Sequence, residues 1–171
     1  MYTLSYWHID SYRELYEFTH DEMFRNTILK GTGSTVVNPD FGRIAKQFKE
    51  EHTVYNYKDD IKASVIRIDF VGTDSQPADL DTITGIVHLL WDYFCDYQYY
   101  YWMVHAESEH CMLYFVISPI NLRYGAFHPV VDLDISNLCH TSRIDRRYSG
   151  SLVPQFPLFL AGDEGENCAG T

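Results

Sequence analysis

Chemically reactive side chains gather between two strand-like runs in the middle of the sequence. His105 ends the run YYYWMVH, Glu107 follows in a short polar loop, and His110 precedes the run CMLYFVIS. Two imidazoles and one carboxylate form a ligand set that divalent metals accept in proteins. These three residues are therefore of types that could support metal chemistry if the fold brings them together.

Candidate contacts to nucleic acid lie elsewhere in the chain. Arg143, Arg146 and Arg147 form the best local basic cluster and could contact phosphate, while the aromatic tract at 91–102 could stack on unpaired bases. The formal net charge of −11 opposes this, because proteins that grip a phosphate backbone gain affinity by displacing counterions with Lys and Arg. A local basic patch could still bind, since exposed charges are screened beyond about 10 Å at moderate salt.

The elements that position these residues follow from hydrophobic periodicity and from helix start signals. Ser11 and Glu14 form a capping box ahead of the first helix, and Asn38-Pro39 is a second helix start. The loop after His105 is too short for a parallel crossover, so the strands around it should form a hairpin. The expected elements are strands at 2–9, 63–71, 99–105, 111–118 and 129–134, helices after Ser11, Asn38-Pro39 and Pro77, a short helix at 135–142, and a loop at 24–37. This order predicts an α+β fold, with a mostly antiparallel sheet of about five strands and helices packed on it.

The length of 171 residues fits one domain, which we place at 1–153. An acidic, Gly-rich tail at 154–171 follows, and we expect it to be disordered. No apolar run reaches the roughly 20 residues needed to cross a bilayer, and the N-terminus lacks a signal-peptide pattern. We therefore expect a cytoplasmic protein without a membrane partner, and the sequence does not indicate its oligomeric state.

The segment WMVHAESEHCMLYFVISPINLRYGAFHP, at 102–129, resembles the central motif of the plasmid relaxase and mobilisation-nuclease (HUH) family. In that motif a strand ends in His, an acidic loop follows, and the next strand carries alternating histidines before a phrase like F-V-x-x-x-x-N-x-x-x-G. The order of the upstream segments is also similar: Asn38-Pro39, SVIRIDF at 64–70, a helix, and DYQYYYWMVH at 96–105. The resemblance covers about residues 10–130 and implies a relaxase-like sandwich.

The resemblance also implies a chemistry. Relaxases form a 5′-phosphotyrosine on DNA while a cation held by three histidines polarises the phosphate. In this sequence the first histidine falls on His105 and the loop acid on Glu107, but the His-hydrophobic-His pair falls on Met112 and Tyr114. His110 matches a further histidine often seen at the start of that strand. The metal site that the resemblance implies is therefore vestigial, and we expect no cofactor unless His105, Glu107 and His110 bind Mn²⁺ or Mg²⁺.

The nucleophile is displaced as well. The family carries its tyrosine on an early helix, in a phrase whose matching position here is Glu17. Tyr16 lies one residue earlier, which rotates a side chain by about 100° on a helix. Tyr16 and Tyr12 are the two candidates for a catalytic tyrosine.

Three hypotheses from different classes stay open. The first is a relaxase-like pseudoenzyme from a mobile element of the plasmid conjugation type, which binds single-stranded DNA or other mobilisation proteins. The second is an active nickase that uses His105, Glu107 and His110 with a displaced tyrosine. The third is an acidic protein-interaction domain without a DNA role. The replaced histidines and the negative charge favour a non-catalytic module, which combines the first hypothesis with the third.

Overall fold

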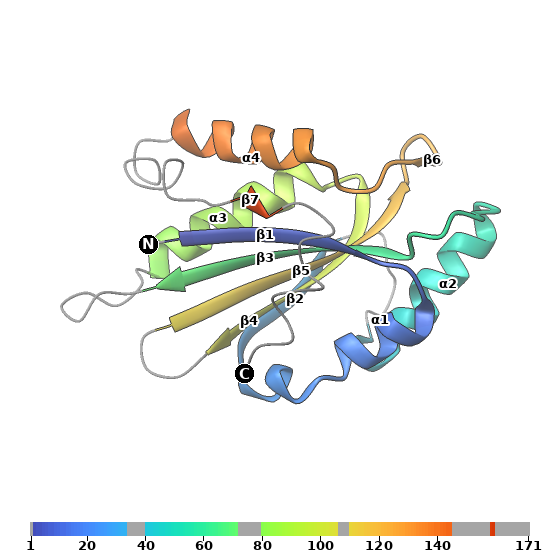
Figure 1. Ribbon diagram of the computed structural model, residues 1–171, viewed down its shortest axis with the longest axis horizontal. Coiled ribbons are helices and arrows are strands. Elements are labelled where there is room, and N and C mark those ends of the chain that lie inside the picture. Colours follow the sequence, from blue (N-terminus) through green and yellow to red (C-terminus); the bar gives the residue numbers. More distant parts are fainter. Residues whose placement is uncertain (1, 34–39, 72–79, 106–109, 145–157, 160–171) are drawn as a thin grey trace.

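The computed structural model describes residues 2–33, 40–71, 80–105, 110–144 and 158–159. Its strands are β1 (Tyr2–Ile9), β2 (Thr27–Gly33), β3 (Ala63–Val71), β4 (Tyr97–His105), β5 (His110–Asn121), β6 (Ala126–Phe127) and β7 (Leu158–Phe159). They form one sheet in the order β2-β4-β5-β3-β1-β7, with β6 paired to β5 (Figure 1). The short β1–β7 pair is parallel and the other pairs are antiparallel. This confirms the α+β class and the mostly antiparallel sheet.

Helices cover both faces of the sheet (Figure 1). They are α1 (Tyr12–Thr19), α2 (Ile44–Val54), α3 (Leu80–Tyr93) and α4 (Asp132–Ile144), with 3₁₀ turns η1 (Glu22–Asn26) and η2 (Phe41–Arg43). One hydrophobic cluster joins the sheet to α3 and α4, and the other joins its opposite face to α1 and α2. Among the described residues, none of the helices has the length and apolarity that a bilayer crossing needs.

The part of the aromatic tract that lies on β4 is core because β4 is covered on both sides. Tyr99 and Tyr101 pack in the cluster under α3, while Tyr100 and Trp102 pack in the cluster under α1 and α2. Successive side chains on a strand point to opposite faces, so a strand buried on both faces reads as a continuous apolar run. These four rings are at most 5% exposed and therefore cannot serve as stacking platforms for bases.

The prediction of a loop at 24–37 is wrong for its described part. Residues 24–26 belong to η1, and β2 pairs antiparallel with β4 from Thr27 to Gly33. Gly31 and Gly33 interrupt the strand pattern, but each faces a tyrosine ring of β4, Tyr101 or Tyr99 respectively. A glycine within a strand marks such a close approach as often as a loop, so the glycines serve the packing of rings contributed by a distant segment.

Two helix starts also differ from the predictions. Asn38-Pro39 lies outside the described residues, and the helical segment begins later, at Phe41, where the Asp40 carboxylate accepts the N–H of Gly42 at 2.9 Å. The capping box at Ser11, by contrast, is confirmed on the hydroxyl side, since Ser11 Oγ accepts the N–H of Glu14 at 3.1 Å.

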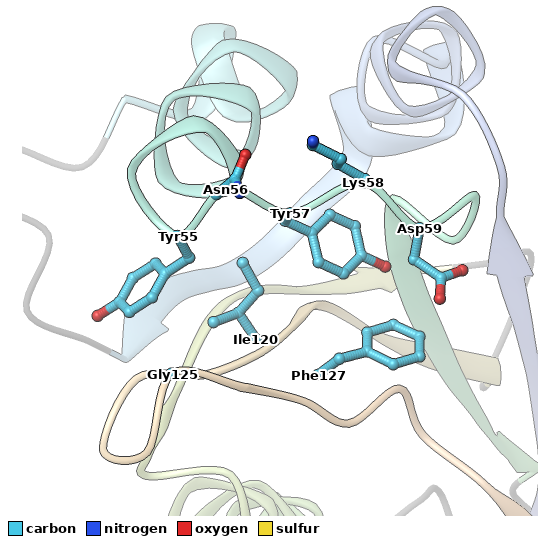
Figure 2. Close-up of a pocket in the computed structure, with 8 residues that line it drawn as sticks. All are labelled: Tyr55, Asn56, Tyr57, Lys58, Asp59, Ile120, Gly125 and Phe127. Carbon is cyan, nitrogen blue, oxygen red and sulfur yellow. The ribbon is translucent and has the colours of Figure 1, made fainter.

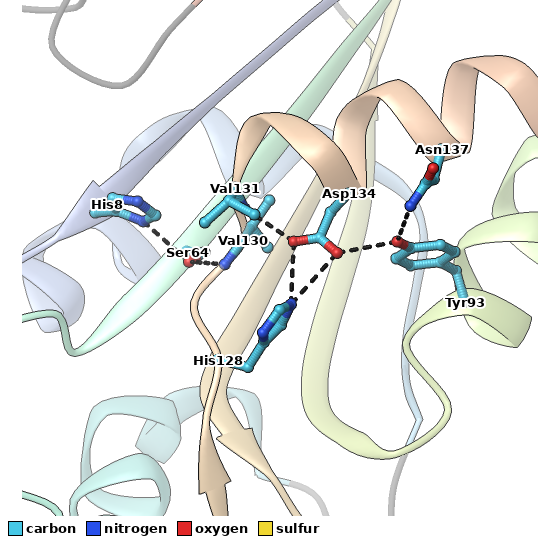
Figure 3. A network of polar contacts seen from close by, with 8 residues as sticks. All are labelled: His8, Ser64, Tyr93, His128, Val130, Val131, Asp134 and Asn137. Atoms are coloured by element: carbon cyan, nitrogen blue, oxygen red, sulfur yellow. Dashed lines mark hydrogen bonds and ion pairs between the residues drawn. The ribbon is translucent and has the colours of Figure 1, made fainter.

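The predicted strand at 129–134 is wrong, because α4 begins at Asp132. The Asp134 carboxylate accepts the N–H of Val131 at 2.9 Å and the hydroxyl of Tyr93 at 2.9 Å (Figure 3). This cap overrides the β propensity of the two valines before it and ties α4 to α3. Ser64 Oγ on β3 accepts the N–H of Val130 at 3.2 Å, which fixes the preceding segment to the sheet.

The short helix predicted at 135–142 lies within the longer α4. Of the predicted tail, Leu158 and Phe159 pair with β1, and the remainder of 154–171 lies outside the described residues.

Replacing Gly33 by alanine tests the packing of β2 on the aromatic core. A Cβ at Gly33 would overlap the hydroxyl of Tyr99, whose ring is buried and packed on Phe115. We expect Gly33→Ala to lower the free energy of unfolding by about 1–3 kcal/mol, the range for overpacked cores, as measured by urea unfolding. Gly42→Ala is the matched control, because its Cβ meets only the Asp40 carboxylate at 3.3 Å, and its effect should stay near 0.5 kcal/mol. Equal losses in the two variants would contradict this account of β2.

Candidate functional site

The two strand positions that correspond to the relaxase histidine pair are closed by packing. Met112 and Tyr114 belong to the α1–α2 side of β5, and Tyr114 is 4% exposed. The hydroxyl of Tyr114 donates to Sδ of Met112 at 3.6 Å. Phe18 of α1 and Phe24 of η1 pack edge-on against the Tyr114 ring, with centroids at 6.0 and 5.4 Å. Aromatic side chains therefore lie where the resemblance places a metal ion.

A charged pair lies beside the same positions. Arg67 and Asp69 of β3 are opposite Tyr114 and Met112 in the strand register. Nη2 of Arg67 lies 3.0 Å from Oδ2 of Asp69. The Asp69 carboxylate is therefore already paired with a cationic side chain. Burial also raises the pKa of Tyr114, so its oxygen is a neutral phenol, which is a poor ligand for Mg²⁺ or Mn²⁺.

Of the three candidate metal ligands, the structure describes the side chain of His105. His105 is exposed at the end of β4, and its Nδ1 lies 3.7 Å from Sγ of Cys111. Cys111 packs with the α3 cluster, on the face opposite Met112. His110 begins β5 opposite Val71, while Glu107 lies outside the described residues. Within the described part of the chain, no group of three or more His, Cys, Asp or Glu side chains could hold a metal ion.

The two candidate tyrosines lie in different surroundings on α1. Tyr16 is 53% exposed, and its ring stacks on His20 with centroids 3.9 Å apart. Tyr12 is half-buried, and its hydroxyl lies 2.7 Å from Nδ1 of His52. The α1 side chain that packs on the Tyr114 ring is Phe18.

A buried polar chain runs inward from Tyr12. Nε2 of His52 lies 3.3 Å from Oγ of Ser118 on β5, and that hydroxyl also donates to Oε1 of Glu51. His52 is 1% exposed and Ser118 is fully buried. A helix was predicted here from the sequence, but this polar chain was not. One signal for it was visible, because His52 is four residues after Phe48 and continues the apolar face of α2.

Burial shifts the pKa values of the two ionisable groups in this polar chain in opposite directions. Desolvation raises the pKa of Glu51 to about 7, although the hydrogen bond from Ser118 opposes the shift. Desolvation lowers the pKa of His52 to about 4, and the charge of Lys62 adds to this. Both groups are therefore held toward their neutral forms, His52 throughout the neutral range and Glu51 below about pH 7.

A shallow pocket of about 280 Å³ opens near the C-terminal end of α2 (Figure 2). Its aromatic walls are Tyr55, Tyr57 and Phe127, and the Tyr57 and Phe127 ring centroids are 5.3 Å apart. Lys58 and Asp59 lie on its polar side. Tyr55 and Phe127 are 40% and 42% exposed, so aromatic surface is accessible from solvent here.

The predicted basic cluster is largely outside the described residues. Arg143 belongs to α4, whereas Arg146 and Arg147 lie outside the described part of the chain. The contact of these three arginines with phosphate therefore stays a prediction.

No known family model, curated protein or solved structure matches this chain. The resemblance to relaxases therefore rests on the motif residues alone.

Substitution of Glu51 by glutamine tests the buried carboxyl. Because its folded pKa is raised, wild-type Glu51 contributes stability that is present below the unfolded pKa of 4.5 and is lost as pH rises toward 7. Glutamine cannot ionise, so the stability of Glu51→Gln relative to wild type should rise by about 3 kcal/mol between pH 4.5 and 7.5. Urea unfolding at a series of pH values measures this difference.

Glu50→Gln is the matched control on the same helix. Glu50 is an exposed partner of Lys46, with a 3.6 Å contact, so its difference from wild type should stay nearly flat over this pH range. A flat difference for Glu51→Gln as well would contradict the assigned burial of its carboxyl.

Proposed function

We propose that this chain is a relaxase-like, non-cleaving binding module of mobile-element origin that works in the cytoplasm. The observation that carries the proposal is the packing of Met112 and Tyr114 beneath Phe18 and Phe24. In a relaxase this region holds the cation that stabilises charge on the phosphate. A thioether and a neutral phenol are poor ligands for that ion, and the neighbouring carboxylate of Asp69 is already paired with Arg67.

A protein is the partner that the surface supports best. The net charge of −11 weakens every mode that depends on the phosphate backbone. Apolar residues are exposed around the pocket at the end of α2, and exposed apolar surface is typical of protein contacts. These are Val54 (80%), Tyr55 (40%), Tyr124 (71%) and Phe127 (42%).

A covalent-adduct assay tests the loss of cleavage. Wild-type protein incubated with Mn²⁺ and a pool of single-stranded oligonucleotides should yield no SDS-resistant protein–DNA adduct on a denaturing gel, because Met112 and Tyr114 stand at two of the three ligand positions of the cation that polarises the phosphate. Tyr12→Phe and Tyr16→Phe are the matched controls. An adduct in wild type that disappears in one of them would establish a working nickase and overturn the proposal.

Fluorescence anisotropy at low salt tests the choice of partner. Labelled single-stranded DNA should show no saturable binding to the wild-type protein, because its net charge repels the backbone. Micromolar binding that weakens steeply as salt rises would show instead that the module binds nucleic acid. An oligonucleotide-binding protein of known affinity verifies the assay.

A further inference from the structure

Four side chains from three elements form a continuous hydrogen-bonded chain between solvent and the core. Tyr12 comes from α1, His52 and Glu51 from α2, and Ser118 from β5. The contacts run from Tyr12 Oη to His52 Nδ1 at 2.7 Å, from His52 Nε2 to Ser118 Oγ at 3.3 Å, and from Ser118 Oγ to Glu51 Oε1. Every member thus touches the next, and the half-buried Tyr12 forms the outer end.

The number of protons in this chain fixes its direction. Ser118 has one hydroxyl proton, and when it donates to an ionised Glu51 it can only accept from His52. His52 then carries its proton on Nε2, so its Nδ1 is an acceptor. The hydroxyl of Tyr12 must therefore donate inward to His52.

A protonated Glu51 requires a different arrangement. Among the described residues, the Ser118 hydroxyl is the side-chain group that hydrogen-bonds to Glu51. A buried carboxyl O–H that lacks an acceptor is costly, so it should donate to Ser118 Oγ. Ser118 then donates to His52 Nε2, the His52 proton moves to Nδ1, and Tyr12 becomes an acceptor on its inner side.

We propose that Tyr12, His52, Ser118 and Glu51 form a two-state hydrogen-bond chain whose direction reverses when Glu51 gains a proton. In the ionised state the Tyr12 hydroxyl donates inward to His52. In the protonated state it donates outward, to solvent or to a bound acceptor. The net change is uptake of one proton by Glu51, because His52 exchanges one ring proton for another and stays neutral.

The groups around the chain are compatible with both states. Burial raises the pKa of Glu51 to about 7 and lowers that of His52 to about 4, so Glu51 titrates near neutrality while His52 remains uncharged. The facing groups are Lys49 of α2, Lys62 before β3, Tyr57 after α2 and Tyr100 of β4, whose hydroxyl donates to Gln47. The two ammonium groups lie 5.8 and 5.6 Å from the Tyr12 ring, at the solvent end of the chain. An acceptor that meets the outward hydroxyl would therefore also meet positive charge.

The His52 tautomer reports the direction of the chain. Long-range ¹H–¹⁵N correlation spectra of the full chain with ¹⁵N-labelled histidine distinguish a protonated ring nitrogen from an unprotonated one. At pH 8.5 we expect Nε2 of His52 to be the protonated nitrogen, and at pH 5.5 we expect Nδ1. The signals of His52 are assigned by their loss in the spectrum of His52→Gln.

Two variants distinguish the reversal of this hydrogen-bond chain from a general effect of pH on His52. Glu51→Gln cannot titrate, and Ser118→Ala breaks the connection, so the His52 tautomer should be independent of pH in both. Backbone amide spectra verify that each variant is folded. A wild-type tautomer that is the same at both pH values, or conversion of His52 to imidazolium, would overturn the proposal. A pH-dependent tautomer that persists in Glu51→Gln would overturn it too.

Discussion

The burial of β4 and β5 on both faces is the constraint on which the remainder of the structure depends. Helices α3 and α4 cover one face and α1 and α2 cover the other, so neither central strand has a face open to water. A side chain in the middle of these strands must then be apolar or fully hydrogen-bonded. This is why β4 is a run of aromatic residues, and why Tyr114 meets rings from α1 and η1. Polar groups that could act lie at strand ends, such as His105, or in satisfied clusters, such as that of Ser118.

The parts of the fold that could be predicted are those whose signals are local. The cap at Ser11, the apolar strand β3 and the hairpin of β4 and β5 were all visible in short stretches of sequence. The strand β2 was missed because its glycines have meaning only opposite the rings of β4, about 70 residues later in the chain, as the 67-residue separation of Thr32 and Tyr99 illustrates. The start of α4 was missed because the cap of Asp134 acts against the β propensity of Val130 and Val131.

The candidate site, like the fold, could be predicted from the sequence only where its signals are local. Strand alternation predicted that Met112 and Tyr114 share a face, and they do. That Phe18 and Phe24 lie over them depends on the placement of α1 and η1, which no local pattern specifies. His52 could be noticed as a polar residue on the apolar face of α2. Its partners Tyr12 and Ser118 are 40 and 66 residues away in sequence, so only the fold identifies them.

The two proposals are linked through the position of α1. This helix places Phe18 against Tyr114 and Tyr12 against His52, which contacts Ser118. Six residues of helix advance about 9 Å, and the four strand residues from Tyr114 to Ser118 advance about 13 Å. One short helix therefore closes the replaced ligand positions at one end and completes the polar chain at the other. A slide or rotation of α1 that carried Tyr12 toward Tyr114 would break the 2.7 Å contact between Tyr12 and His52. The polar chain thus adds to the cost of moving α1, because the buried His52 would lose the hydroxyl of Tyr12.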